Sequence, residues 1–262
     1  MRSRIVRIAL PVLAAGILQA QVHAPQVGVI RCSDGSVRAV YGLAANFILA
    51  SKPFASAGSA SFSDRAGLTA ANGRIELIKT DGTRIGEYES HEASPVLNVD
   101  GDAASAIAWL PSDHAILRWT GASFQLYPLS PLEGRVTSLK ATSPDRAQLL
   151  VLNEDGSTSR ATVTLSTGEL VSLDAVPGTS GPAFAQQAAV ISQEQNRLVV
   201  ETANGLRQPL PVPEDVTIER MSTGWLHLSS ATTNRHWALH VSGPQIELFV
   251  LPGVRSGKEA GK

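Results

Sequence analysis

The sequence predicts an all-β protein built from repeated units of about four short strands. Two observations carry this prediction. Apolar and polar residues alternate along most of the chain, as in GRIELIKTDG (73–82) and QIELFVL (245–251), and a period of two is typical of strands with one buried face. Turn-forming dipeptides separate these stretches, and no convincing amphipathic helix follows the N-terminal segment.

The N-terminus has the layout of a secretory signal peptide over residues 1–20. The segment MRSRIVR (1–7) is basic and precedes an apolar run over 8–18 that ends near the small residue Ala20. Such a run is too short to span a bilayer, which takes about 20 apolar residues. We therefore expect cleavage after Ala20, or alternatively after Ala24, and a secreted or periplasmic product. A retained membrane anchor is the other interpretation.

Composition places the rest of the chain among ordinary globular proteins. The chain is 43% hydrophobic and 17% charged, and its net charge of -1 creates no field that would favour nucleic acid or an anionic membrane. The single cysteine, Cys32, cannot form an internal disulfide. We expect it to be a small buried residue rather than a nucleophile or an intermolecular bridge. One β domain is expected over 21–253, followed by a disordered tail over 254–262.

Turn signals predict a meander of antiparallel strands. Asn-Gly and Asp-Gly dipeptides supply the positive φ angles that two-residue hairpin turns demand. Such dipeptides occur at 34–35, 72–73, 81–82, 155–156 and 204–205, with Thr-Gly at 167–168.

The strands group into five segments that share a plan of strand, turn, strand, glycine turn and strand. The segments run from about Ala57 to Ser90, Pro95 to Leu129, Gly134 to Val176, Gly181 to Pro211 and Asp215 to Leu251, a spacing of roughly 35 to 45 residues. A four-stranded unit of this size cannot bury both faces alone, whereas repetition around an axis buries them. The sequence therefore predicts a β-propeller of about six blades, with two β-sandwiches as the alternative.

The N-terminal stretch VGVIRCSDGSVRAVYG (27–42) forms one hairpin without the rest of a blade. We expect it to complete the last blade, so that both ends of the chain close the ring. Three similar turns are expected at equivalent points of three blades. They lie in FSDRAGLTAA (62–71), LPSDHAILRW (110–119) and TSPDRAQLLVL (142–152).

On these repeats, hairpins and turns, residues 27–251 resemble secreted β-propeller repeat proteins. The WD-repeat and kelch signatures are missing, because no Trp precedes Asp and no Gly-Gly pair occurs. The resemblance implies a disc with a central channel whose loops bind a partner. Functions on such discs range from scaffolds to hydrolases and lyases, so the fold decides little about activity.

His236 and His240, in RHWALHV (235–241), are the first candidates for a metal site. On the expected strand, positions four apart lie roughly 13 Å from each other. Two histidines on one zinc ion must each bring a nitrogen within about 2.1 Å of it. We therefore expect no metal there. The intervening apolar residues should pack on one face, the histidines should lie on the other, and His227 of the partner strand should be able to approach one of them.

The motif NVDGDAASA places Asn98, Asp100 and Asp102 at alternating positions, which resembles the start of a calcium loop. Ala103 stands where such a loop needs glycine, and Trp109 where it needs glutamate. We interpret the segment as a solvated turn.

The remaining candidates are given structural roles. Glu87 and Glu89 alternate on an expected outer strand near Glu76 and Glu92, and we interpret these carboxylates as a solvated face. The segment PGTSGP (177–182) is interpreted as a connection between blades. The tryptophans are expected on strands and packed in the core: Trp109, Trp119, Trp225 and Trp237.

No Gly-x-Ser-x-Gly motif, phosphate-binding glycine loop or zinc motif is present in the sequence. We therefore expect an exported module that binds a protein or an envelope polymer, rather than an enzyme, with no cofactor and no membrane insertion after signal removal. No catalytic, binding or metal residue is assigned. The alternative is an extracellular hydrolase or lyase acting on carbohydrate or peptide, with residues converging on the channel. A third interpretation is an inert part of a larger envelope assembly.

Overall fold

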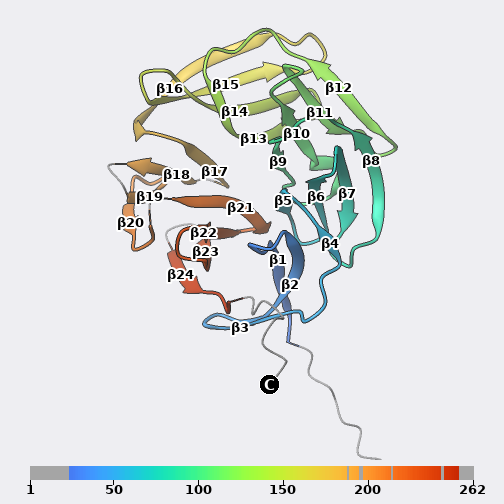
Figure 1. Ribbon diagram of the computed structural model, residues 1–262. Coiled ribbons are helices and arrows are strands. Elements are labelled where there is room, and N and C mark those ends of the chain that lie inside the picture. The colour runs from blue at the N-terminus through green and yellow to red at the C-terminus, as the bar shows by residue number, and fades with distance from the viewer. Residues whose placement is uncertain (1–23, 188, 195–196, 214, 243–244, 254–262) are drawn as a thin grey trace, which may run out of the picture.

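Six antiparallel four-stranded sheets stand around a central axis in the computed structural model of the protein (Figure 1). The structure describes residues 24–253 except 188, 195–196, 214 and 243–244. The predicted all-β propeller is thereby confirmed. The predictions of a signal peptide and of a disordered tail fall outside the described residues.

The blades follow one another along the chain, and in blades 2 to 6 the strands are ordered from the axis outward. Blade 1 contains β1 (Gln26–Arg31), β2 (Ser36–Leu43), β3 (Asn46–Leu49) and β4 (Ala55–Ser56). Blade 2 contains β5 (Ser59–Phe62), β6 (Ala66–Ala71), β7 (Arg74–Lys79) and β8 (Arg84–Glu89). Blade 3 contains β9 (Val96–Asn98), β10 (Ile107–Leu110), β11 (Ala115–Trp119) and β12 (Phe124–Pro128).

Blade 4 contains β13 (Arg135–Ser143), β14 (Arg146–Leu152), β15 (Ser157–Thr164) and β16 (Leu170–Ser180). Blade 5 contains β17 (Ala183–Gln186), β18 (Ala189–Glu194), β19 (Arg197–Thr202) and β20 (Arg207–Leu210). Blade 6 contains β21 (Val216–Ser222), β22 (Trp225–Ser230), β23 (Arg235–Ser242) and β24 (Gln245–Val250). A 3-10 helix, η1 (Ala103–Ser105), precedes β10. Within the described part of the chain, no helix is long and apolar enough to cross a membrane.

The five predicted segments coincide with blades 2 to 6, apart from the end of β16. This strand continues through most of PGTSGP, which is therefore not simply a connection between blades. The pairing of β16 with β15 is irregular here. Ser159 pairs with Ala175, but Ser157, two positions earlier, pairs with Ser180, so β16 contains extra residues between these pairs. The extra residues form a local turn in which Thr179 donates from its hydroxyl to the carbonyl of Val176.

The prediction that the N-terminal hairpin completes the last blade is wrong. β1 to β4 form a blade of their own, and blade 6 draws all four strands from its own segment. The outer part of blade 1 consists of the short strands β3 and β4, which both pair with β2. Neither is long enough to show an alternating pattern in the sequence.

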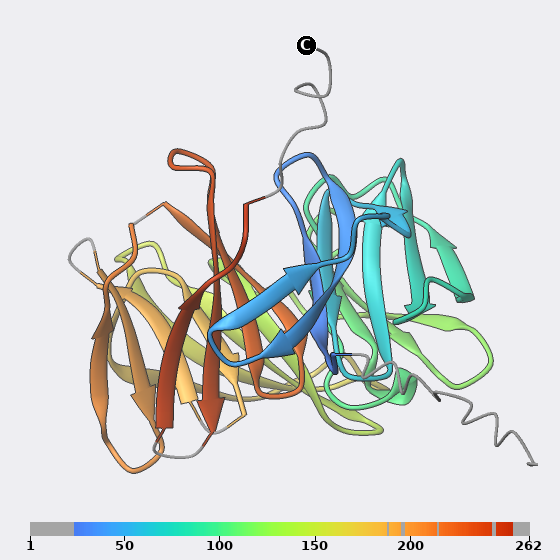
Figure 2. The ribbon, with the colours of Figure 1, turned by 90° about the horizontal axis from the view of Figure 1, so that it is seen from below.

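The first and last blades lie side by side (Figure 2), and packing between their side chains closes the ring. Phe47 of blade 1 makes edge-to-face contacts with Trp225 and Phe249 of blade 6, at ring-centroid distances of 5.8 Å. Cys32 is fully buried in the same cluster beside Met221. The expectation that Cys32 is a buried apolar residue is confirmed, and burial raises the pKa of its thiol.

The expected glycine turns are present, but they differ in length. Asn72 and Gly73 have φ values of 50° and 75°, as a two-residue turn requires. The Asp-Gly turn of blade 1 is one residue longer, because Cys32 and Ser36 are the residues that close it. Asp34 accepts from the Ser36 amide, and hydrogen bonds from Ser36 lower the pKa of this carboxyl.

We expect Gly73→Ala to lower the free energy of unfolding by about 1–2 kcal/mol, because it places a Cβ atom on a left-handed residue. The space at this position is adequate, since the nearest atom to an added Cβ lies at 3.6 Å. Urea unfolding measures the effect. Gly58→Ala is the matched control, because Gly58 lacks a positive φ and also has room. An equal loss in both variants would contradict the backbone explanation.

Two of the three similar turns occupy equivalent points. Asp64 lies between β5 and β6, and Asp145 between β13 and β14. The third prediction is wrong, because Asp113 and His114 lie between β10 and β11, one hairpin further along their blade. Helix η1 lies in the connection between β9 and β10. Because of this longer connection, the alternation pattern of the sequence did not reveal the first hairpin of blade 3.

Candidate functional site

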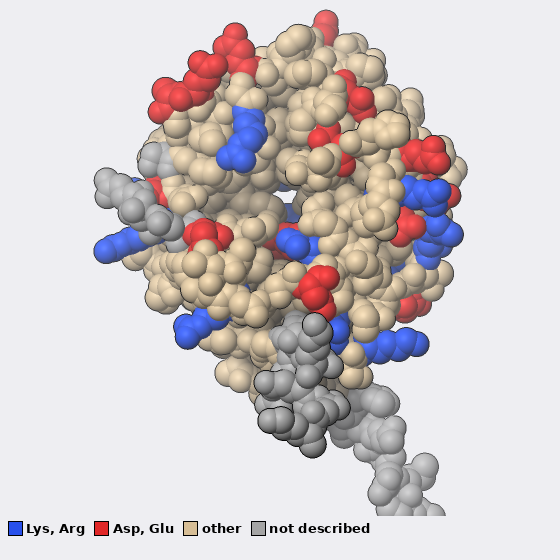
Figure 3. Space-filling view, in the orientation of Figure 1, with Lys and Arg blue, Asp and Glu red and all other residues tan. Residues whose placement is uncertain are grey.

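The central channel is the candidate functional site. The innermost strands β5, β9, β13, β17 and β21 surround an opening that passes through the middle of the disc, with charged side chains at its edge (Figures 1 and 3). Each is the first strand of its blade, so all begin at one mouth and end at the other. The two ends of the channel differ in chemistry.

A pocket of about 330 Å³ lies at the mouth where the innermost strands begin. Its apolar lining comes from four consecutive blades, which supply the set that we name the apolar mouth: Val96, Val136, Ala183, Phe184, Val216 and Ile218. Arg135 and Thr217 are exposed at its rim. Apolar concave sites with a few polar groups are typical of ligand binding.

One step further along the same strands the residues become polar. Asn98 follows Val96, Gln186 follows Phe184 and Arg220 follows Ile218, each two positions later on the same strand face. In β13 the Ser138 hydroxyl accepts from the Ala185 amide of blade 5, so Ser138 lies on the face of the strand toward blade 5. Lys140 is two positions later and therefore lies on the same face. We name these four residues the polar ring: Asn98, Lys140, Gln186 and Arg220.

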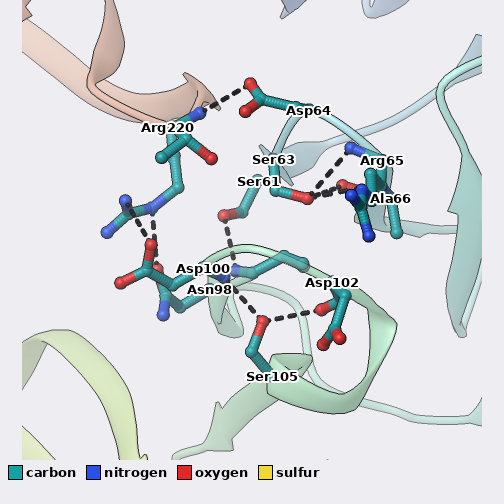
Figure 4. A network of polar contacts seen from close by, with 12 residues as sticks. Ser61, Ser63, Asp64, Arg65, Ala66, Asn98, Asp100, Asp102, Ser105 and Arg220 are labelled. Atoms are coloured by element: carbon teal, nitrogen blue, oxygen red, sulfur yellow. Dashed lines mark hydrogen bonds and ion pairs between the residues drawn. The ribbon is translucent and has the colours of Figure 1, made fainter.

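Arg220 spans the channel (Figure 4). Its Nε donates to Asn98 Oδ1 at 3.0 Å, and its Nη1 lies 3.4 Å from Asp100 Oδ1. Blade 6, which carries Arg220, lies opposite blade 3, which carries the two acceptors. The Arg220 side chain is only 1% exposed. Burial lowers the pKa of the guanidinium, and the Asp100 carboxylate opposes this effect.

The polar ring carries an excess of positive charge. Lys140 experiences the charges of Asp100, Arg160 and Arg220. Burial is the main cause that lowers the pKa of its ammonium group, and the two arginines lower it further while Asp100 raises it. Of these cations, Arg220 is the one in contact with the Asp100 carboxylate.

Several buried polar groups of this region have no hydrogen-bond partner. They are both amide atoms of Gln186, the Nδ2 atom of Asn98 and the Nε atom of Arg160. Gln186 is fully buried. Unpaired buried donors cost about 1–3 kcal/mol each, so a molecule that accepts hydrogen bonds here would satisfy groups that the protein leaves unpaired.

Glu219, next to Arg220, lies where three blades meet. Its Oε1 atom accepts from Arg31 Nε of blade 1 at 2.9 Å and from the Ala60 amide of blade 2 at 3.2 Å. Strand β21 therefore contacts β5 directly, beside β1 (Figure 1). Glu219 Oε2 lies 3.7 Å from His227 Nδ1.

His227 and His236 form a buried stacked pair, so one of the expected histidine contacts is confirmed. His227 Nε2 and His236 Nδ1 are 2.8 Å apart, and the rings are nearly parallel. The pKa of His236 is lowered to about 4, first by burial and then by His227 and Arg31, while Glu219 raises it. The pair faces blade 1 and the apolar residues of β23 face blade 5, so the expected placement on opposite faces of the strand is confirmed.

His240 lies apart from this pair, as the strand geometry predicts. Its ring stacks on Trp225 with a centroid distance of 4.4 Å, and its Nδ1 atom lies 3.3 Å from Glu247. Among the residues that the structure describes, no three His, Cys, Asp or Glu side chains gather closely enough to hold a metal ion.

The interpretation of NVDGDAASA as a solvated turn is wrong for its first part. Asn98 is 2% exposed, and Asn98 and Asp100 both bind Arg220. Only Asp102 has a local role, since it accepts from the Ala104 amide and caps η1.

The other candidates have the expected structural roles. Glu87 and Glu89 lie exposed on the outer strand β8 beside Arg84 and Arg74, whereas Glu92 accepts from the Ser112 amide of blade 3. All four tryptophans lie on strands. Three are buried and Trp225 is half-buried: Trp109, Trp119, Trp225 and Trp237.

Sequence reasoning missed Lys140, Gln186 and Arg220. The available signal was two adjacent charged residues, Glu219 and Arg220, in the middle of the first strand of a blade. Charged residues in the first strand of a blade must lie near the axis or a blade seam, where they need partners.

No protein-family model matches the chain, and no curated protein matches its sequence. Solved structures do match its fold. One is PorZ, an essential bacterial surface component of the type-IX secretion system of Porphyromonas gingivalis, with a TM-score of 0.50 and 11% identity over 89% of this chain and 38% of PorZ. The protein is a six-bladed β-propeller.

Two other similar structures have lower TM-scores. Virginiamycin B lyase from Staphylococcus aureus, solved with quinupristin, has a TM-score of 0.45 and 16% identity over 88% of this chain and 85% of the lyase. A protein of unknown function from Desulfotomaculum acetoxidans has a TM-score of 0.42 and 10% identity over 72% of this chain. The chain spans 65% of that protein's length.

Proposed function

We propose that this protein is an exported binding module, secreted or periplasmic, which takes an apolar segment of a protein or envelope polymer into the apolar mouth. The observation that carries the proposal is the pocket of about 330 Å³ at the mouth of the central channel, lined mainly by the starts of four innermost strands. Four blades hold its walls, so the pocket is preformed, and preformed sites avoid the entropic cost of ordering on binding.

The N-terminal pattern supports export, since a basic segment precedes a short apolar run. The shape of the pocket supports an end or loop of a larger molecule as the ligand. A volume of about 330 Å³ is at the small end for ligand sites, so only part of a polymer enters, and the disc face around the mouth contacts the remainder.

Site-specific photocrosslinking in the cells that produce the protein tests this function. A photoreactive residue at Thr217, on the exposed rim, should capture one recurrent partner. The same residue at Thr83, exposed at the outer turn of blade 2, is the matched control. Val216→Glu should reduce capture from Thr217 at least fivefold, because it introduces a charge into the apolar mouth. Equal capture from both positions, or none from Thr217, would overturn the proposal.

A further inference from the structure

The apolar mouth and the polar ring together form a two-part site. Along β9, β17 and β21 they are two residues apart on one strand face, a separation of about 7 Å. A ligand that enters along the axis therefore meets apolar walls first and cationic and amide groups second. The bridge from Arg220 to Asn98 lies across the channel beneath the pocket.

The charge of the ring selects an anionic group. Lys140 and Arg220 give the ring two positive charges beside the single Asp100 carboxylate, and the amides of Gln186 and Asn98 retain unpaired N–H donors. A carboxylate can accept from several such donors at once, and hydrogen bonds to a charged group are the stronger kind. A neutral apolar ligand would leave these donors unsatisfied.

The geometry restricts where the carboxylate belongs in the ligand. The pocket admits a chain end on, and the ring lies beneath it, so the carboxylate must be terminal and an apolar group must precede it. The hydroxyl of Thr217 and the guanidinium of Arg135 at the rim favour a ligand with polar backbone groups over a bare hydrocarbon chain.

We infer that the polar ring binds the C-terminal carboxylate of a partner protein whose last residues are apolar and lie in the apolar mouth. This inference rests on the proposed function and names the partner's chemistry. Carboxyl termini are recognised elsewhere by convergent donors at the end of an apolar groove. Here one side chain from each of four consecutive blades supplies the donors.

Fluorescence anisotropy tests the inference with the full chain. The probes are N-terminally labelled hexapeptides ending in Val, Leu, Ile or Phe, each as the free acid and as its C-terminal amide. We expect at least one free acid to bind about tenfold more tightly than its amide, the effect of one charge-assisted hydrogen bond. If no acid binds more tightly than its amide, the inference is wrong.

Two variants locate the effect in the polar ring. Lys140→Gln should bring the acid-to-amide ratio close to one, because it removes a cation that faces the carboxylate. Lys79→Gln removes the same charge from an exposed position on blade 2 and should preserve the ratio. Equal loss in both variants would show general electrostatics and overturn the inference. Lys140 is only half-buried, and its substitution leaves the Arg220 bridge intact.

Sodium octanoate competition distinguishes the ligand class. Octanoate carries the same carboxylate on a hydrocarbon chain, and we expect it to displace the peptide acids only weakly. If octanoate binds while every peptide fails, the occupant is a fatty carboxylate and the C-terminal inference is overturned. The two failures are distinguishable. If the peptide acids do not bind but a partner is still captured from Thr217, the C-terminal inference fails and the proposed function does not. If nothing is captured from Thr217, the proposed function itself fails.

Discussion

Glu219→Ala should lower the free energy of unfolding by about 3–5 kcal/mol, the usual cost of removing one partner from a buried ion pair. The carboxylate joins Arg31 of blade 1 to the Ala60 amide of blade 2, and its side chain is 9% exposed. Its loss leaves the Arg31 guanidinium, whose side chain is 19% exposed, without its counter-ion where the ring closes. Chemical denaturation monitored by tryptophan fluorescence measures the change.

Two further variants test this explanation. Glu87→Ala removes an exposed carboxylate from the outer strand of blade 2, which also pairs with arginine, and should cost less than about 1 kcal/mol. The double variant Arg31→Met/Glu219→Leu should recover much of the loss, because apolar residues of similar size can replace a buried pair. A loss in Glu219→Ala no larger than in Glu87→Ala would contradict a structural role for the junction.

Stability should fall by about 3 kcal/mol as the pH is lowered from 7 to 4, because of His236. The pKa of His236 is about 4 in the folded protein, below its ordinary value of 6.5. Between these values the unfolded chain binds a proton that the folded protein does not bind. Acid therefore favours the unfolded state, and the loss develops as the pH falls through this window. Denaturation curves at half-unit pH steps measure it.

His236→Asn should flatten this pH dependence, since an amide can replace the hydrogen bond to His227 but does not titrate. His240→Asn is the matched control on the same strand, where the imidazole is partly exposed and lies beside Glu247. It should leave the slope unchanged. If His236→Asn keeps the full slope between pH 6.5 and 4, another group causes the acid sensitivity.

The repeat architecture could be predicted because each strand and turn has a recognisable pattern within a few neighbouring residues. Alternating residues in β7, β14 and β23 identify strands without knowledge of their neighbours. Glycine at 73 identifies a hairpin because only a few residues tolerate its backbone angles. The boundaries of blades 2 to 6 follow from these local signals. Blade 1 was not predicted as a complete blade because β3 and β4 are too short to show an alternating pattern. The first hairpin of blade 3 was not predicted because η1 lies between its two strands.

The candidate site could not be predicted in the same way. Asn98 and Arg220 are 122 positions apart in the chain, and the sequence signal around Asn98 pointed to a surface turn. Which residues share the channel depends on how blades are placed around the axis, which no local pattern encodes. The contact between His227 and one of the other histidines could be predicted, because His227 and His236 belong to adjacent strands of one hairpin.

The sequence by itself therefore determined the propeller and the strands and hairpins of most blades, since these depend on contacts between residues close in the chain. Only the tertiary structure decided the closure of the ring through Glu219 and the two-part channel. Both join side chains from separate blades, and their chemistry exists only once the ring has brought distant charges and unpaired donors into one buried space.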